Sequence, residues 1–315
     1  MGKKVYRIFL ITSWVVVLIT SACNLLIEKD FTIPKSEIVY QAINNTTNID
    51  LSNNLIGFVN ADGSGGVQIP LKLLRPYRPL VSKEWGGIFF GGGRENPLGI
   101  SFSDGPLYFL NQNDELQSCN TSDGPFYFPL HGRKYVLVFD DTNVALLDLF
   151  TCWKVKTLVS LPTEVPWKIK IFSAMPSDSG DKVIFSEVYS TLPDYRYVIY
   201  IVDIDTGTTK EFLEGGFNAS LSPDEKKIAY VGDKGIYVAN VDGTHQTLLV
   251  PMNLDPLIDI NPWPFWSTDG TTLVYHKCTN SACYDLSDFS IYQVNVNTGV
   301  EKKIIAGGLF PIWIK

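Results

Sequence analysis

Hydrophobic and polar positions alternate in three stretches of this chain that repeat one another at a spacing of 45 residues. Each stretch is an apolar strand preceded by a polar turn: the strands are residues 180–185, 225–230 and 270–275, and the turns are 177–180, 222–225 and 267–270. The turns are built from Ser, Asp, Pro and Gly, which restrict φ, tolerate positive φ or bond side chain to backbone. We therefore expect each turn to join two strands of a hairpin.

A second alternating strand, with a shared tyrosine, follows each of these strands, at residues 198–203, 235–240 and 290–295. Polar turns at 205–207, 242–244 and 297–299 then lead into a further strand, at 210–213, 247–250 and 302–305. Each unit therefore predicts a four-stranded antiparallel sheet. A repeat of about 40–50 residues with four strands is typical of a propeller blade, which is stable only between neighbouring blades.

Residues 219–240 (ASLSPDEKKIAYVGDKGIYVAN) and 264–275 (PFWSTDGTTLVY) resemble the repeat of the TolB-type propellers, also called PD40 or WD40-like repeats. The resemblance covers residues 165–315 and is weak before them. It implies protein–protein contact within the cell envelope, but we expect no counterpart of the additional α/β domain that precedes the TolB propeller, so a role in the Tol system is not carried over. WD40 proper is disfavoured, because its Gly-His pairs are missing and the chain has only three histidines, His131, His245 and His276.

Six blades fit the chain when strands and turns are counted back from the repeat. Residues 124–160 offer strands at 126–128, 134–139, 144–149 and 154–159, and residues 79–119 offer strands at 87–90, 98–102, 107–110 and 115–119. We expect the first blade to have strands at 55–61 and 67–71 and a third at 38–42, and its inner strand to be supplied by residues 309–313. The predicted fold is an all-β, six-bladed β-propeller over residues 38–315, closed by the C-terminal strand in blade 1.

The amino-terminal residues have the pattern of a lipoprotein signal peptide. Lys3, Lys4 and Arg7 precede an apolar run, residues 8–19, and a small-residue cleavage site that ends in Cys23. Thr20 departs from the lipobox, where Leu is more common. We expect removal of residues 1–22, a lipid on Cys23 and a tether over residues 23–37, which gives an extracytoplasmic lipoprotein, periplasmic or on the outer cell surface. The alternative is an uncleaved signal anchor, although the run is shorter than the roughly 18 residues of a spanning helix.

The formal net charge and the number of cysteines are consistent with an exported protein. Removal of residues 1–22, which carry three basic and no acidic residues, takes the formal net charge from −7 to −10, so we expect no nucleic-acid partner. Four cysteines then remain, and we expect a local disulfide between Cys278 and Cys283. Cys119 and Cys152 are the remaining pair. Our expected strand register places them on opposite rims. Two alternatives follow: they form a disulfide and that register is in error, or they are two free thiols.

Candidate chemistry is sparse. The chain has no G-x-S-x-G, H-E-x-x-H, Walker or EF-hand motif and no metal-binding spacing, so we expect no enzyme activity, no cofactor and no metal. The glycine-rich residues 91–95 are expected to form a loop, residues 203–205 a turn, and His276 a structural position. Trp266 and Trp313 are expected in the blade cores.

The long loops of the predicted propeller indicate a candidate binding surface on one rim. In a propeller, the loops between the second and third strands and the links between blades lie on one rim, and the longest here are residues 190–196, 278–288 and 253–263. They carry aromatic and charged residues suited to a protein, peptide or sugar partner: Tyr195, Arg196, Asp255, Asp259, Trp263, Tyr284, Asp285 and Asp288. Alternatively, Trp263 packs between blades and the acidic residues only solubilise the rim.

The sequence therefore predicts a membrane-tethered, non-enzymatic protein-binding or scaffold module. The first alternative is a carbohydrate or cell-wall-binding lipoprotein, for which Trp263, Trp266 and Tyr284 would form an exposed platform. The second is a propeller hydrolase or lyase with its site in the central channel.

Overall fold

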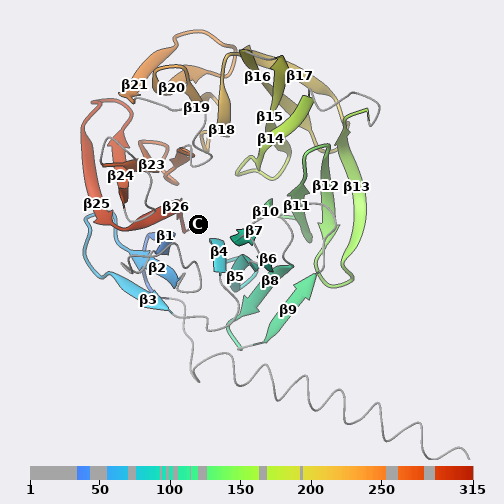
Figure 1. Cartoon of the computed structure of the whole chain (residues 1–315), viewed down its shortest axis with the longest axis vertical. Helices are drawn as coiled ribbons and strands as arrows, with labels where there is room; N and C mark the ends of the chain where they lie inside the picture. Colours follow the sequence, from blue (N-terminus) through green and yellow to red (C-terminus); the bar gives the residue numbers. More distant parts are fainter. Residues whose placement is uncertain are drawn as a thin grey trace, which may run out of the picture.

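The computed structural model describes residues 34–42, 55–69, 76–92, 94–96, 99–101, 106–113, 115–119, 126–162, 169–191, 194–252, 262–279 and 288–314. These residues form an all-β propeller of six four-stranded antiparallel sheets arranged around a central axis (Figure 1). No helix among them is long and apolar enough to cross a membrane. The predicted signal peptide, residues 1–22, and Cys23 lie outside the described residues.

Blades 4–6 follow the repeat that the sequence predicts. From the axis outward, blade 4 is β14 (Ile169–Pro176), β15 (Lys182–Thr191), β16 (Asp194–Asp203) and β17 (Thr209–Glu214). Blade 5 is β18 (Phe217–Leu221), β19 (Lys227–Gly232), β20 (Gly235–Asn240) and β21 (Thr247–Pro251). Blade 6 is β22 (Phe265–Trp266), β23 (Thr272–Cys278), β24 (Phe289–Asn295) and β25 (Glu301–Ala306).

The turns that open these blades share one geometry. In each, the first serine donates its backbone N–H to the residue five positions on and accepts that residue's N–H on its Oγ: Ser177 with Lys182, Ser222 with Lys227 and Ser267 with Thr272. The fourth residue has positive φ, 73° at Gly180, 54° at Glu225 and 69° at Gly270. The predicted hairpin turns are thus confirmed.

Blades 1–3 precede the three clear copies of the repeat. Blade 3 is β10 (Phe126–Pro129), β11 (Tyr135–Phe139), β12 (Asn143–Asp148) and β13 (Trp153–Ser160), as expected. Blade 2 is β4 (Pro76–Ser82), β5 (Gly87–Gly92), β8 (Leu107–Asn111) and β9 (Leu116–Cys119). The prediction of a blade strand at 98–102 was wrong, because β7 (Gly99–Ser101) pairs with β6 (Arg94–Asn96) in a separate hairpin. The inner strand was missed because Pro79 interrupts its alternating pattern.

Blade 1 joins the two ends of the described chain. Its order from the axis is β26 (Gly308–Trp313), β1 (Ile38–Ala42), β2 (Leu55–Val59) and β3 (Val67–Ile69). Ile38 lies opposite Trp313 and Ala42 opposite Gly308, so the C-terminal strand completes the blade as predicted (Figure 1). Tyr40, fully buried in β1, covers Gly57 on the neighbouring strand so closely that a Cβ there would lie 2.3 Å from its ring.

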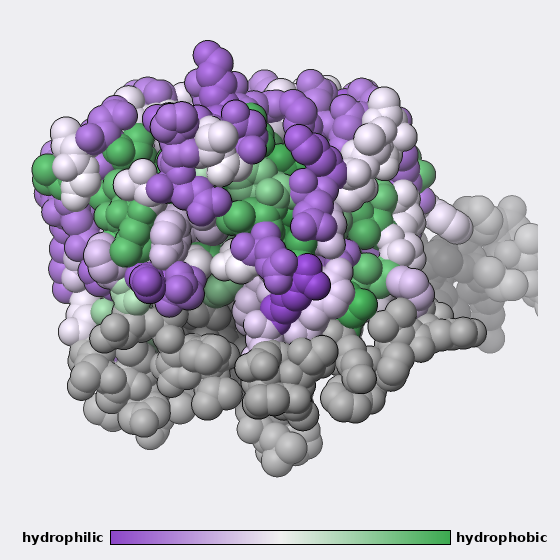
Figure 2. Space-filling view, turned by 90° about the horizontal axis from the view of Figure 1, so that it is seen from above, coloured by the Kyte–Doolittle hydropathy of each residue, from purple (hydrophilic) through white to green (hydrophobic). Residues whose placement is uncertain are grey.

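Two rims follow from this topology. The turn rim carries the turns between the first and second strands, at 83–86, 130–134, 177–181, 222–226 and 267–271, and those between the third and fourth strands. The loop rim carries the other connections. On the side of the disc seen in Figure 2, hydrophobic residues form separate patches among hydrophilic ones, so that view shows no single apolar face.

Candidate functional site

A funnel opens on the turn rim and enters the axis of the propeller. Its volume is about 410 Å³, and its walls come from the inner strand or first turn of all six blades. The apolar wall residues are Leu80, Val81, Phe128, Pro129, Leu130, Met175, Pro176, Leu221, Phe265, Trp266, Ile312 and Trp313, and the polar ones are Ser82, Lys83, Glu84, His131, Ser177, Asp178, Ser220 and Thr268. This volume lies within the range of about 300–1,000 Å³ that is usual for small-ligand pockets.

The funnel narrows at a ring of apolar side chains. Leu80, Phe128, Phe265 and Ile312 line both the funnel and a second cavity of only about 10 Å³ beyond it. There the guanidinium of Arg78 lies between two rings, 5.0 Å from the centroid of Trp263 and 4.3 Å from that of Phe310. This narrow end, as far as the described residues form it, is the floor of the funnel.

Strand bulges build this floor. Arg78 and Phe310 have positive φ, 49° and 48°, and each lies where the pairing of its inner strand with the next strand shifts register. A bulge redirects side chains locally. Both residues precede a proline, Pro79 or Pro311, which cannot donate a ladder hydrogen bond and is tolerated at such irregular positions.

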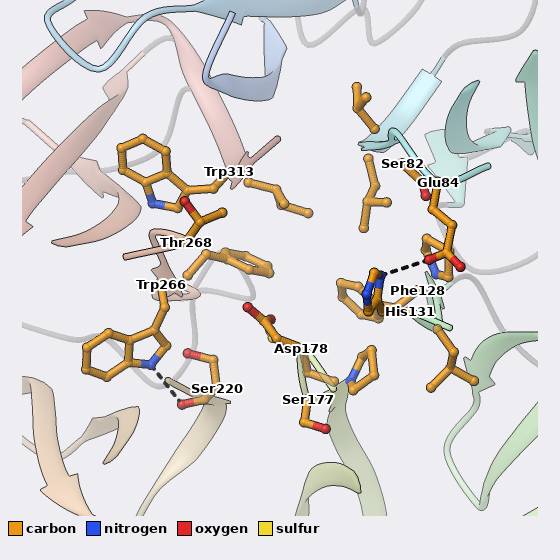
Figure 3. Close-up of a pocket in the computed structure, with 18 of the residues that line it drawn as sticks. Ser82, Glu84, Phe128, His131, Ser177, Asp178, Ser220, Trp266, Thr268 and Trp313 are labelled. Carbon is orange, nitrogen blue, oxygen red and sulfur yellow. Dashed lines mark hydrogen bonds and ion pairs between the residues drawn. The ribbon is translucent and has the colours of Figure 1, made fainter. Parts of the chain in front are cut away.

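The funnel wall has two chemically different halves. Among the described lining residues, the ionisable ones come from blades 2, 3 and 4, which are consecutive around the ring: Lys83, Glu84, His131 and Asp178. Blades 5, 6 and 1 contribute Ser220, Leu221, Phe265, Trp266, Thr268, Ile312 and Trp313. Figure 3 shows Trp313, Trp266 and Thr268 on one side of the funnel and Glu84 and His131 on the other.

Internal contacts hold both halves in place. On the polar side, the Glu84 carboxylate lies 2.8 Å from His131 Nδ1 and accepts the Gly132 backbone N–H at 3.1 Å. On the apolar side, the Trp266 indole N–H donates to the Ser220 carbonyl (3.1 Å), and the Ser220 hydroxyl donates to the Pro264 carbonyl (2.6 Å). The walls are therefore largely preformed, which reduces the entropic cost of binding.

The predicted rim residues are not brought into one described cluster. Asp255, Asp259, Tyr284 and Asp285 lie outside the described residues. The Asp288 carbonyl accepts the backbone N–H and the hydroxyl of Thr279 at the base of its loop. Trp263 is 3 % exposed and packs against Phe128 across the axis, with ring centroids 5.9 Å apart, so it is part of the channel floor.

Tyr195 and Arg196 lie in a strand and not in a long loop. The expectation of a loop over 190–196 was wrong: β15 and β16 pair as far as Thr191 and Asp194, because the alternating, tyrosine-rich segments continue the ladder. Tyr195 is 48 % exposed, and Arg196 Nε lies 2.7 Å from the Glu214 carboxylate. These two residues remain accessible on the loop rim.

Sequence reasoning missed the funnel mouth. His131, Asp178 and Thr268 each hold the second position of the turn that opens their blade, and Lys83 holds the first position of the turn in blade 2. From the sequence, Asp178 and Thr268 were expected only as turn residues, and no role was assigned to Lys83 or His131. The signal was the repeat itself, since equivalent positions of a closed ring converge on its axis.

The cysteines form one described disulfide. Cys119 and Cys152 are bonded, with Cα atoms 5.4 Å apart, and link blades 2 and 3. The expectation that they lie on opposite rims was wrong: β9 has only four residues, so Cys119, at its end, stays near the turn that holds Cys152. Cys278 is also disulfide-bonded, and its predicted partner, Cys283, lies outside the described residues.

Other expectations concern single residues. His276 is fully buried, and its Nδ1 accepts the Phe310 backbone N–H at 3.4 Å, which agrees with a structural position. Trp266 and Trp313 are buried, at 2 % and 9 % exposure. Within the described ranges, no three His, Cys, Asp or Glu residues are grouped so that they could hold a metal ion.

Comparison with protein-family models finds no match, and comparison with curated proteins finds none either. Solved structures do match. TolB from Acinetobacter baumannii matches with a TM-score of 0.61 and 16 % identity, over 99 % of this chain and 74 % of that chain. A protein described as a putative TolB from Agrobacterium tumefaciens matches with a TM-score of 0.60 and 14 % identity, over 82 % of this chain and 91 % of its own.

An enzyme shares the fold as well. An oligogalacturonate lyase in complex with manganese matches with a TM-score of 0.53 and 14 % identity, over 87 % of this chain and 75 % of that chain. At these identities the likeness concerns the fold alone. The chain is a six-bladed propeller similar in structure to the propeller of TolB, and function has to be argued from its own residues.

Proposed function

We propose that this protein is a membrane-tethered, extracytoplasmic, non-enzymatic binding module whose funnel receives a segment of a partner protein. The observation that carries the proposal is the shape and chemistry of the funnel: a largely preformed cavity of about 410 Å³ that opens on the turn rim and narrows at a ring of apolar side chains before it reaches Arg78. Such a site suits a projecting side chain or chain end that buries apolar surface. The structural likeness to TolB is consistent with this role.

The sequence supports the tether. A lipid on Cys23 would anchor the chain, and residues 24–37 would connect it to the propeller. Glu37 lies on the turn rim, where its carbonyl accepts the Ile314 backbone N–H at 2.7 Å. Glu37, at the described end of the tether, and the funnel mouth thus share a rim. Metabolic labelling with a fatty-acid analogue is expected to mark the wild-type chain and not a Cys23→Ser variant, and equal labelling of both would contradict the anchor.

The alternatives have less support. A carbohydrate platform of Trp263, Trp266 and Tyr284 would need exposed rings, and the first two are 3 % and 2 % exposed. A hydrolase or lyase acting in the channel draws support from the fold shared with the oligogalacturonate lyase and from the titratable residues Glu84, His131 and Asp178 in the funnel wall, but Glu84 is already held by His131 and by the Gly132 N–H.

Photo-crosslinking on intact cells tests the location of the site. A crosslinking amino acid is placed at Thr268, exposed at the funnel mouth, at Tyr195 on the loop rim, and at Asn297, an exposed turn residue of blade 6 outside the funnel. We expect one defined protein adduct from position 268 and none from 297. An adduct from position 195 alone would move the site to the loop rim, and identical adducts from all three would contradict a defined site.

A further inference from the structure

We propose that one edge of the propeller, the aromatic edge formed by Trp85, Phe150 and Trp153, inserts into the headgroup region of the membrane that carries the lipid anchor. This goes beyond the proposed function: it rests on the anchor in that proposal and does not depend on the funnel. The inference follows from three features: the exposure of these rings, the rigidity of the turn that presents them, and the place where the tether meets the propeller.

The aromatic edge lies on the turn rim, where blades 2 and 3 meet. Trp85 belongs to the turn 83–86 of blade 2 and Phe150 to the turn between β12 and β13 of blade 3, and their rings are stacked with centroids 6.2 Å apart. Phe150 is 66 % exposed, and Trp153, the first residue of β13, is 75 % exposed. Tyr195, another exposed aromatic residue of the described ranges, lies on the opposite rim. The exposed indole and phenyl rings are therefore concentrated at one place.

The turn that carries Phe150 is held rigidly. The Asp148 carboxylate accepts the backbone N–H groups of Phe150 and Thr151, both at 2.9 Å, and Cys152 is bonded to Cys119 of blade 2. The apolar rings are thus held in water before any partner binds, and little conformational entropy is lost on contact. A group of apolar rings held at the surface in this way is typical of an interaction site.

The described end of the tether indicates what this site contacts. Glu37 lies on the same rim, in blade 1, where its carbonyl accepts the Ile314 backbone N–H, and blade 2 lies between blades 1 and 3 (Figure 1). The segment from Cys23 to Pro34 spans at most about 40 Å when fully extended. A lipid on Cys23 would therefore keep the turn rim, and with it the aromatic edge, close to the membrane surface.

The chemistry of the aromatic edge fits the membrane–water interface. Tryptophan is enriched at this interface, where its amphipathic ring lies at the level of the headgroups. The formal net charge of −7 gives no general attraction to anionic lipids, so the contact is driven by burial of apolar surface and needs no anionic headgroup. Because the aromatic edge belongs to blades 2 and 3 alone, the disc meets the membrane at an angle, and the funnel mouth stays open on the side of blades 5 and 6.

Tryptophan fluorescence of the full chain, purified from its membrane and reconstituted in phosphatidylcholine vesicles, tests the proposal. Phosphatidylcholine brominated on its acyl chains quenches a tryptophan that it contacts, whereas acrylamide quenches one exposed to water. Trp153→Phe keeps an aromatic ring and removes the fluorophore, so its difference from wild type isolates the signal of Trp153. We expect this signal to be quenched by the brominated lipid and shielded from acrylamide.

Three further variants serve as comparisons. Tyr195→Trp adds a tryptophan on the loop rim, and we expect acrylamide but not the brominated lipid to quench it. Phe150→Ser is expected to reduce the quenching of Trp153 by the brominated lipid. Val300→Ser, which replaces a residue of the same 66 % exposure in the outer turn of blade 6, is expected to leave that quenching unchanged.

The outcomes separate this inference from the proposed function. A chain that does not float with the vesicles would overturn the anchor and, with it, the membrane contact. A chain that floats, but whose Trp153 is quenched by the brominated lipid no more than a tryptophan at position 195, would overturn the aromatic edge and leave the anchor and the funnel in place. A protein adduct from a crosslinking amino acid at position 150 on intact cells would assign the edge to a protein partner and also overturn the proposal.

Discussion

The contacts between consecutive blades, called seams below, differ in kind from the strand pairing that closes the ring. Between blades 4 and 5, Glu225 accepts hydrogen bonds from Lys182 and Ser179. Between blades 5 and 6, Asn218 Nδ2 donates to the Pro262 carbonyl at 3.0 Å. The ring closes instead within blade 1, where the backbone of β26 pairs with β1.

This difference predicts a ranking of effects. A seam of side-chain contacts loses about 1 kcal/mol per hydrogen bond when one is removed. Loss of β26 would instead leave the β1 edge unpaired and uncover the faces of blades 6 and 2 that pack against blade 1. Loss of the closing strand is therefore expected to unfold the whole ring, whereas loss of one side-chain contact in a seam is expected to lower the stability only in part.

Deletion of residues 309–315 is expected to have the largest effect. It removes most of β26 and its pairing with β1, so we expect aggregation or loss of the cooperative unfolding transition in circular dichroism. Removal of Lys315 alone serves as the control and should change little. A stable monomer of the 309–315 deletion would show that the ring does not need this strand.

The Cys119–Cys152 disulfide is expected to have the next largest effect, because it fixes the seam between blades 2 and 3 covalently. It spans 33 residues, for which the chain-entropy model gives about 3–4 kcal/mol. The double variant Cys119→Ala, Cys152→Ala should lose about this much in urea unfolding. Reductant should lower the stability of the wild type by more than that of the variant. A loss below about 1 kcal/mol would mean that the seam is held by its other contacts.

Much of the scaffold could be predicted from sequence because turns and strands are local. The Ser at the start of each turn and the residue at positive φ near its end recur at Ser177 and Gly180 and at Ser267 and Gly270. Closure was predictable because residues 309–313 repeat the spacing of an inner strand, which is the strand that blade 1 lacked. The inner strand of blade 2 was not, since Pro79 and the inserted β6–β7 hairpin disturb the local pattern.

The candidate site was less predictable, because it depends on convergence around the axis. Asp178 and Thr268 are 90 residues apart and look like ordinary turn residues. Trp263 looked like a rim residue, but the start of its blade turns inward and buries it against Phe128. Long loops drew attention to the loop rim, whereas the described cavity opens on the other.

Gly180→Ala is expected to show that equivalent seams are packed differently. Gly180 has a φ of 73°, and a Cβ there would lie 2.2 Å from the His131 carbonyl oxygen of blade 3. The left-handed conformation costs Ala about 1 kcal/mol and the clash a further 1–2, so we expect a loss of about 2–3 kcal/mol in urea unfolding.

Gly270→Ala is the matched control, because Gly270 occupies the equivalent turn of blade 6. Its φ is 69°, and the nearest atom to an added Cβ is Pro223 Cδ at 3.6 Å, an ordinary contact. Only the conformational cost of about 1 kcal/mol is expected here. Equal losses in the two variants would mean that the blade 3–4 seam yields to the added methyl group.

Among the changes to the seams, Glu225→Gln is expected to lower the free energy of unfolding least, and the size of this effect should depend on pH. Burial raises the pKa of the Glu225 carboxyl, but hydrogen bonds from Lys182 and Ser179 lower it by more, so the pKa lies below its usual value. A lowered pKa stabilises the fold above the pKa of the unfolded chain, and this contribution is lost as pH falls through the folded value. Wild type should therefore exceed the variant by about 1 kcal/mol at pH 7, and the difference should shrink below about pH 4.

Glu214→Gln provides the comparison for this measurement. Glu214 pairs with Arg196 within blade 4, and the two side chains are 57 % and 53 % exposed. Solvent screens such a pair, so its loss should change the urea midpoint little at any pH. A pH-independent difference between wild type and Glu225→Gln would assign the effect of Glu225 to packing. A difference that fades only for Glu225 would show that the blade 4–5 seam, unlike the backbone closure in blade 1, depends on charge.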